Sequence, residues 1–215
     1  LADRTAIIRR GQIIAQGTPL ELKERLLGPP LLEIRLARTI EALPEDRRGY
    51  PSRSLASLQA LFQANPAQFG RAEVVRYAPA APSFGEPGSA DMVLTFRNVH
   101  NWLGSGQAEG MFAGFFEVLR PGGVLGVVDH RAADGMAEYD DSGYVGQDRM
   151  IALAEATGFR FDAGSEINAN PRDTKDHPNG VWTLPPTNNH EDADAERYAE
   201  IGESDRMTLR FVKPE

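Results

Sequence analysis

The chain has 215 residues, 41% of them apolar and 25% charged, which is typical of an ordinary globular protein. Its formal net charge of −8 argues against a nucleic-acid backbone or an anionic membrane surface as the main partner. The absence of cysteine excludes disulfides, thiolate metal sites and cysteine nucleophiles. No apolar run approaches the roughly 20 residues of a membrane span, and no signal peptide is visible, so we expect a cytoplasmic chain without a span. Because Leu1 lies inside what reads as a folded element, we expect a fragment or a processed piece.

The first 45 residues are expected to form an appendage made of a hairpin, a helix and a strand. Residues 5–8 and 13–16 read as two strands joined by a turn at residues 9–12. Thr18 and Pro19 suit the N-cap and the first position of a helix that ends at Gly-Pro-Pro, residues 28–30. Residues 32–36 read as a third strand. The polar residues 46–53 are expected to be a linker to a domain at 54–215.

Helices and strands alternate in the rest of the chain, which indicates an α/β fold with a mostly parallel sheet. We expect helices at residues 54–64, 106–119, 146–157 and 193–201, and strands at 72–77, 91–96, 124–128, 159–167 and 207–212. The strands at 91–96 and 124–128 are continuous apolar runs, so both are expected to be buried on both faces. Residues 168–186 form a long polar loop, which in a compact domain indicates a functional or mobile segment.

Polar side chains follow two of these strands and form the candidate site. The strand at 91–96 leads into Arg97, Asn98, His100, Asn101 and Trp102, and the strand at 124–128 leads into Asp129, His130 and Arg131. Because ligands of open parallel sheets bind outside the carboxyl ends of the strands, we expect these segments to converge with residues 168–175. His100 and His130 would then be candidate bases, and Arg131 could clamp an anionic substrate.

Each candidate has an alternative. A structural role is equally expected for His100 and for His130, and His177 and His190 are expected to have no catalytic role. A metal site made of His100, Asp129 and His130 is a weaker alternative, because the sequence lacks a tight ligand spacing. We therefore expect no metal.

Two stretches resemble known families. Residues 1–45 resemble the C-terminal tail of ABC-transporter ATP-binding subunits, chiefly through Gly-Gln-Ile-Ile-Ala-Gln-Gly-Thr-Pro at 11–19. The phosphate-binding loop Gly-x-x-x-x-Gly-Lys-Ser/Thr does not occur, so this segment is expected to be inert packing material. From about residue 49 the chain is similar to class I S-adenosylmethionine-dependent methyltransferases, through Leu-Arg-Pro-Gly-Gly-Val-Leu at 119–125. It is more narrowly similar to a bacterial group of predicted methyltransferases, through the runs 94–102, 165–171, 180–186 and 201–207.

The second resemblance implies a Rossmann-like sheet of order 3-2-1-4-5-7-6, with the last strand of the chain antiparallel. It implies S-adenosylmethionine as cofactor and a small-molecule methyl acceptor. We expect catalysis by His100 and His130. The expected cofactor-binding residues are Phe96, Arg97, Asn98 and Asn101. The expected substrate-binding residues are Trp102, Arg131, Asn168, Asn170, Lys175 and Trp182.

The sequence also departs from that family. No Gly-x-Gly turn follows a strand before residue 91, although the family uses that turn and a following acidic residue to hold the cofactor. We therefore expect weak or no binding of S-adenosylmethionine, unless Glu45 or Asp46 replaces the acid. Without the family's first strands, the strand at 72–77 would lack a partner. One edge of the strand at 91–96 would be open to self-association. A non-catalytic remnant, or a regulatory domain on an ABC ATP-binding subunit, is the alternative function.

Overall fold

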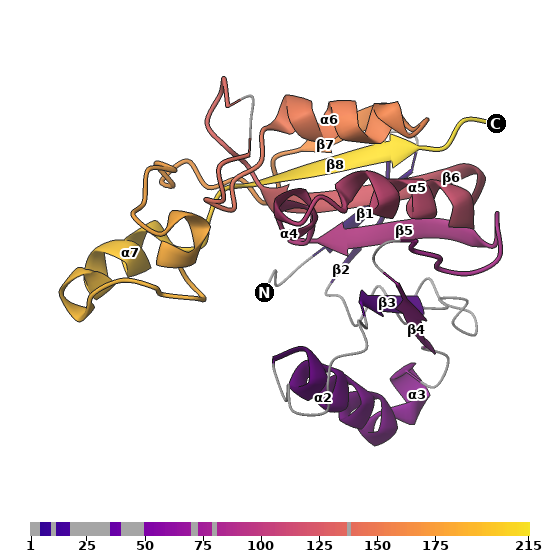
Figure 1. The fold of residues 1–215 in the computed structure, drawn as a ribbon, viewed down its shortest axis with the longest axis horizontal. Helices are drawn as coiled ribbons and strands as arrows, with labels where there is room; N and C mark the ends of the chain where they lie inside the picture. Colours follow the sequence, from indigo (N-terminus) through magenta and orange to yellow (C-terminus); the bar gives the residue numbers. More distant parts are fainter. Residues whose placement is uncertain are drawn as a thin grey trace. The chain divides into compact units, whose positions relative to one another are not determined.

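The computed structural model describes residues 5–9, 12–17, 35–39, 50–69, 73–78, 81–136 and 139–215 (Figure 1). The chain divides into two compact units, residues 1–36 with 45–74 and residues 37–44 with 75–215. In the described part of the chain, no helix is long and apolar enough to cross a membrane.

The N-terminal strands form an antiparallel hairpin, as expected. β1 (Thr5–Arg9) pairs with β2 (Gln12–Gly17) in a two-stranded sheet of their own, with an irregularity between Ile7 and Ile8. The helix expected after Thr18 falls outside the described residues. The expected third strand is found further along the chain, as β3 (Arg35–Thr39).

Two helices and a second small sheet follow. α2 (Tyr50–Ala64) begins earlier than expected, and Asn65 separates it from the short α3 (Pro66–Phe69). Their aromatic rings Phe62 and Phe69 lie 5.2 Å apart. β4 (Glu73–Tyr77) pairs with β3 in a two-stranded sheet, so the expectation that this strand has no partner is wrong.

The larger unit is built on a four-stranded mixed sheet of order β5-β6-β8-β7 (Figure 1). β5 (Ala90–Phe96) and β6 (Leu119–His130) are parallel, whereas β8 (Arg206–Val212) is antiparallel to both β6 and β7 (Arg160–Ser165). This is the 4-5-7-6 portion of the implied strand order, and the antiparallel last strand is confirmed. β5 is an edge strand among the described residues, as expected.

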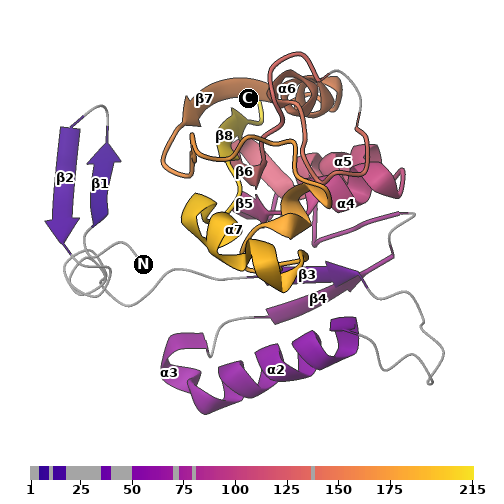
Figure 2. The same cartoon turned by 90° about the vertical axis from the view of Figure 1, so that its left-hand side faces the viewer.

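Helices pack on one face of this sheet (Figure 2). α4 (Val99–Gly104), α5 (Ala108–Val118) and α6 (Gln147–Ala156) share a core with the alternate residues of β6 and β8. The side chains at its centre are Val99, Met111, Phe112, Leu125, Val127, Met150, Met207 and Phe211, all at most 2% exposed. The sequence did not predict α4, because Trp102 and the following Gly-Ser-Gly read as a loop.

The opposite face of β5 is open, which corrects the expectation that this strand is buried on both faces. Its residues alternate: Thr95 is buried, whereas Met92, Leu94 and Phe96 are 55–57% exposed. β6 alternates as well, with Leu125 and Val127 fully buried and Gly126 and Val128 half-buried. The apolar run of β5 therefore belongs to a strand that packs on one face only.

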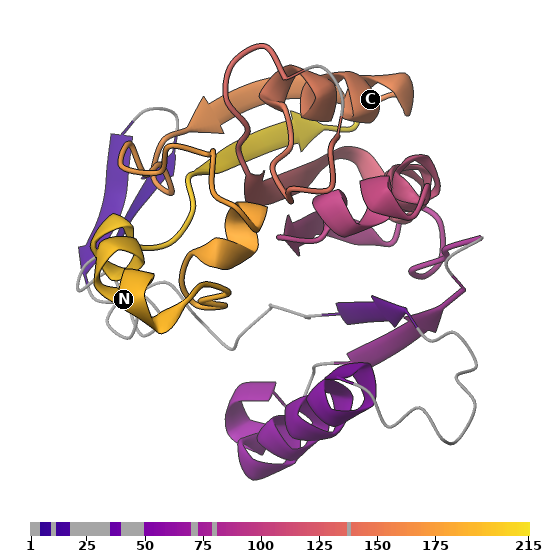
Figure 3. The same cartoon turned by 60° about the vertical axis from the view of Figure 1, so that its left-hand side comes forward.

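Residues 166–205 join the end of β7 to the start of β8. They lie beyond the edge of the sheet at which β6 ends (Figure 3). This segment contains two 3-10 helices, η1 (Gly180–Thr183) and η2 (Asp192–Asp194), and the short α7 (Ala195–Ile201). The backbone N–H of Arg131 donates to Asp205 O at 2.9 Å, which ties the end of β6 to the turn before β8.

Candidate functional site

Asp129 organises the carboxyl-terminal end of the sheet. Its side chain is fully buried at the end of β6, beside the start of α4. Oδ2 accepts the backbone N–H groups of Val99 (2.8 Å) and His100 (3.3 Å), and Oδ1 accepts the N–H of His130 (2.8 Å). The carboxylate thus satisfies donors that the first turn of a helix leaves free. This contact fixes α4, and with it His100, against the end of β6.

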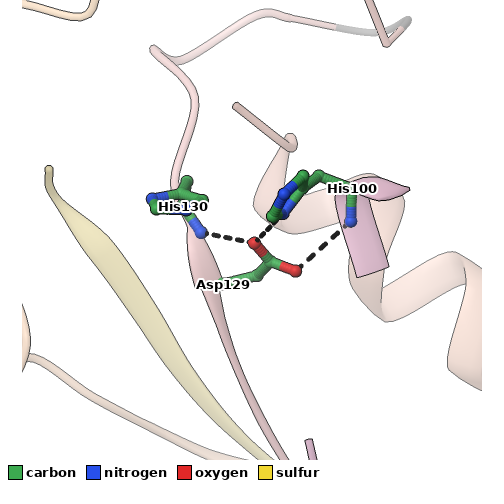
Figure 4. A group of neighbouring side chains, drawn as sticks. All are labelled: His100, Asp129 and His130. Carbon is green, nitrogen blue, oxygen red and sulfur yellow. Dashed lines mark hydrogen bonds and ion pairs between the residues drawn. The ribbon is translucent and has the colours of Figure 1, made fainter. Parts of the chain in front are cut away.

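The imidazole of His100 pairs with the same carboxylate. Its Nδ1 lies 2.9 Å from Asp129 Oδ1, and both side chains are at most 5% exposed (Figure 4). Because a carboxylate oxygen accepts hydrogen bonds, this pairing favours a proton on Nδ1 and, in the neutral imidazole, leaves the lone pair on Nε2. A histidine oriented in this way can take a proton from a bound substrate.

His130 lies beside this pair and is held by Ser204. The two imidazole rings are 5.1 Å apart between centroids, and Nδ1 of His130 lies 2.5 Å from Ser204 Oγ. Burial lowers the pKa of His130 to about 4 despite the opposing charge of Asp129, and nearby positive groups add to the decrease. His130 is therefore neutral at pH 7.

Trp182 covers the cluster from the segment between β7 and β8. Its ring meets that of His100 edge-on at 6.1 Å. It lies in η1, where Gly180 has a φ of +54° and a side chain would come within 2.0 Å of Ser142 O. Only glycine allows this close approach of η1 to the loop around Ser142.

The expected convergence of the three polar segments is confirmed by contacts. The segment after β5 contacts the end of β6 through Asp129, and the loop at 168–175 contacts it through Asp205.

The expected substrate clamp Arg131 is already paired with carboxylates of the chain itself. Its guanidinium donates to both oxygens of Glu166 (2.9 and 2.7 Å) and to Asp205. These hydrogen bonds raise the pKa of Arg131 further, and they already use its Nε, Nη1 and Nη2 as donors.

Two other expected substrate-binding residues are also used internally. Lys175 Nζ lies 2.8 Å from Asp205 Oδ2, and Asn170 donates its side-chain amide to the carbonyls of Ile201 and Glu203. Burial would raise the pKa of Asp205, but the hydrogen bonds from Arg131, Lys175 and the Asn170 N–H lower it to about 2.

Asn168 and Trp102 also lie elsewhere. Asn168 is exposed and donates to Thr208 Oγ1 at 2.8 Å. Trp102 packs on the core, 5.7 Å from the ring of Phe115. Because residues two apart on a helix point in nearly opposite directions, Trp102 cannot share the surroundings of His100. Of the expected substrate-binding residues, the contacts bring only Trp182 to the histidines.

The sequence did not predict a second buried network next to this site. Asp173, 5% exposed, accepts hydrogen bonds from the Tyr144 hydroxyl (2.9 and 3.0 Å) and from the N–H of Asp205 (2.7 Å). His177 Nε2 lies 2.9 Å from the same carboxylate. Burial and the charge of Asp173 raise the pKa of Tyr144.

A metal ion is a further possibility at the first cluster. Ligand atoms of His100, Asp129 and His130 lie within 4.8 Å of one another. Both carboxylate oxygens of Asp129 already accept two hydrogen bonds each, so a metal ion would have to compete with them. The arrangement suits a carboxylate that orients a histidine better than a direct metal ligand.

Comparison with known proteins shows a fold but no sequence family. No family model matches the sequence. No curated protein matches it either. Neither result supports the resemblance of residues 1–45 to an ABC-transporter subunit.

Solved structures match at low identity. The cyclase SpnF is 14% identical with a TM-score of 0.50, over 84% of this chain and 74% of that chain. A candidate sarcosine dimethylglycine methyltransferase from Galdieria sulphuraria is 16% identical with a TM-score of 0.51, over 85% and 70%. The S-adenosylmethionine-dependent methyltransferase SibL is 11% identical with a TM-score of 0.53, over 86% of this chain and 44% of that chain. The chain therefore has an α/β fold similar to that of class I methyltransferases. Since one neighbour is a cyclase, the fold alone does not define the reaction.

The four residues expected to bind the cofactor lie at the end of β5 and the start of α4. Phe96 and Arg97 are exposed at the end of β5, Asn98 donates to Thr95 Oγ1 at 3.4 Å, and Asn101 is exposed in α4. Asp129 follows Val128, the register partner of Phe96, and both of its oxygens already accept hydrogen bonds. This carboxylate is therefore not free to hold ribose hydroxyls.

Proposed function

We propose that this chain is a methyltransferase-type domain that keeps the acceptor side of the active site and binds S-adenosylmethionine weakly or not at all. The reaction would be methyl transfer to a small-molecule acceptor. The observation that carries the proposal is the buried pair of His100 and Asp129 at the carboxyl ends of β5 and β6, in a fold similar to class I methyltransferases. Ligand sites of open α/β sheets lie at this end.

His100 would be the proton acceptor. Asp129 holds its Nδ1–H, so Nε2 is free to receive the proton of an acceptor hydroxyl or amine. His130, neutral at pH 7, would accept a hydrogen bond or a proton beside it. Trp182 would form one wall of the acceptor site through its contact with His100. These roles rest on the geometry of the side chains.

A non-catalytic domain is the second candidate, and the missing glycine-rich turn favours it. Production of S-adenosylhomocysteine distinguishes the two. The wild-type protein would be incubated with millimolar S-adenosylmethionine and a panel of small hydroxyl, amine and carboxylic-acid acceptors. We expect slow turnover that falls by about 100-fold or more in His100→Ala, the usual contribution of a general base. Glu109→Ala, an exposed change on the neighbouring helix α5, tests whether a loss is specific.

The outcome decides between the candidates. If the folded wild-type protein forms no S-adenosylhomocysteine above background with any acceptor, the enzymatic proposal fails and the non-catalytic domain stands. Isothermal titration with S-adenosylmethionine tests the other half of the proposal. A micromolar dissociation constant would refute weak binding.

A further inference from the structure

Two arginines flank His130 across the end of the sheet. His130 ends β6, and Arg206, the first residue of β8, lies directly opposite it in the antiparallel register. On the other side, Arg97 follows β5, and its backbone N–H donates to Val128 O at 2.8 Å. Because neighbouring strands are about 4.8 Å apart, the two arginine backbones lie within about 10 Å of each other. Their long side chains can therefore reach one small group bound beside His130.

Arg206 is mostly buried and only partly paired. Its side chain is 16% exposed, and Nη2 bonds Glu203 Oε2 at 2.5 Å. Its Nε is buried and has no hydrogen-bond partner among the described residues. A buried donor without a partner is costly, and each one in a folded protein needs an explanation. An acceptor atom of a bound ligand would satisfy it.

Arg97 is held in an unusual backbone conformation and has no partner among the described residues. Its φ is +55°, a left-handed value that is uncommon for residues other than glycine. The side chain is exposed, and its guanidinium makes no hydrogen bond or ion pair with another described residue. Non-glycine residues in this conformation cluster at ligand sites, where the surrounding structure holds them in place.

The surroundings suit an acid with an apolar body. Phe96, directly before Arg97, is 57% exposed, and its register partner Val128 is half-buried. The carboxylate of Asp129 is occupied by four hydrogen bonds, so it does not neutralise the arginines by direct pairing. Both Arg97 and Arg206 add to the lowering of the pKa of His130 that burial begins, which agrees with their lying near it.

We propose that Arg97 and Arg206 form a subsite for the carboxylate of a small apolar acid, whose body lies along Phe96. This inference deepens the proposed function and rests on it, because it makes the methyl acceptor a carboxylic acid with a second nucleophilic group near His100. A carboxylate matches the planar donors of a guanidinium. A monoanion suits the subsite better than a phosphate dianion, because Glu203 already balances part of the charge of Arg206.

The test uses benzoate as the probe and benzamide as its neutral counterpart, without S-adenosylmethionine. Binding is followed through the Cε1 proton of His130 and by isothermal titration at pH 7. We expect benzoate to shift the His130 signal and benzamide to bind at least about tenfold more weakly. Arg97→Gln and Arg206→Gln should each weaken benzoate binding by about tenfold or more, as expected for loss of a charge-assisted hydrogen bond. Arg210→Gln, on the same strand and paired with Asp162, should leave it unchanged.

Equal binding of benzoate and benzamide would overturn the subsite, as would unchanged benzoate affinity in both Arg97→Gln and Arg206→Gln. Inorganic phosphate binding more tightly than benzoate at the same residues would also overturn it. Because Arg97 is exposed, its variant tests the proposal even if Arg206→Gln fails to fold. Carboxylate binding without S-adenosylhomocysteine production would keep the subsite and refute the methyltransferase. Turnover of acceptors without a carboxylate would support the methyltransferase and refute the subsite.

Discussion

Replacing Asp129 with asparagine tests whether this side chain sets the geometry of the site. The carboxylate accepts four hydrogen bonds, whereas an amide offers one oxygen and one NH₂ group. The least costly arrangement keeps the oxygen toward the N–H groups of Val99 and His100. The NH₂ group then faces His130 N–H and His100 Nδ1. His100 can respond by moving its proton to Nε2 and accepting at Nδ1, but the His130 N–H is left without an acceptor.

The magnitude follows from this arrangement. An unsatisfied buried donor costs about 1–3 kcal/mol, and the change from charge-assisted to neutral hydrogen bonds adds about 1 kcal/mol. We therefore expect Asp129→Asn to lower the free energy of unfolding by about 2–4 kcal/mol, measured by urea unfolding with tryptophan fluorescence. Nitrogen NMR should show that His100 has changed from the Nδ1–H to the Nε2–H tautomer. Its basic Nε2 would then be lost to catalysis.

Asp91→Asn is the matched control. The side chain of Asp91 is 84% exposed and pairs with the exposed Arg120, so its loss should change stability by at most about 0.5 kcal/mol. The reasoning is refuted if Asp129→Asn costs no more than Asp91→Asn. It is also refuted if His100 keeps its Nδ1–H tautomer in the Asp129 variant.

Three further predictions concern titration and backbone. The pKa of His130 is about 4 in the folded protein and about 6.5 in the unfolded chain, so the unfolded chain binds a proton first as the pH falls. The free energy of unfolding should therefore fall by about 3 kcal/mol from about pH 6.5 to 4, and the Cε1 proton of His130 should titrate near pH 4. The pKa of Asp205 is about 2 in the folded protein and about 3.8 in the unfolded chain, so the free energy of unfolding should fall by about 2 kcal/mol from about pH 4 to 2. This loss should be absent in Asp205→Asn. Gly180→Ala places a carbon 2.0 Å from Ser142 O and should cost at least about 2 kcal/mol in thermal unfolding, whereas Gly135→Ala, at φ +86° with open space around it, should cost about 1 kcal/mol.

The order of the main helices and strands could be predicted from the sequence, but the burial of their side chains and the pairing of the strands could not. The run Met-Val-Leu-Thr-Phe at 92–96 predicted a strand correctly. An apolar run does not reveal whether a second layer covers the strand, and here Met92 and Leu94 are exposed. β4 likewise pairs with β3, which precedes it by more than 30 residues in the chain.

The candidate site could also be predicted only in part. The convergence of His100, Asp129 and His130 could be predicted because strand ends in a parallel sheet meet at one edge. The state of Arg131 could not, because its partners Glu166 and Asp205 lie 35 and 74 residues further along the chain. A positive residue after a strand therefore identifies a candidate for anion binding. Whether it is free depends on distant carboxylates whose positions only the fold defines.

The burial of His130 links the proposed methyl transfer to the proposed carboxylate subsite. His130 is neutral because its charged form is poorly solvated and lies near Arg97 and Arg206. An anion held between these arginines would offset their charge and favour the protonated imidazole, so its binding would raise the pKa of His130. By linkage, protonation of His130 must strengthen anion binding by the same free energy. A carboxylate acceptor would therefore bring His130 closer to the pKa at which it can exchange protons, while Asp129 keeps His100 in the tautomer of a base.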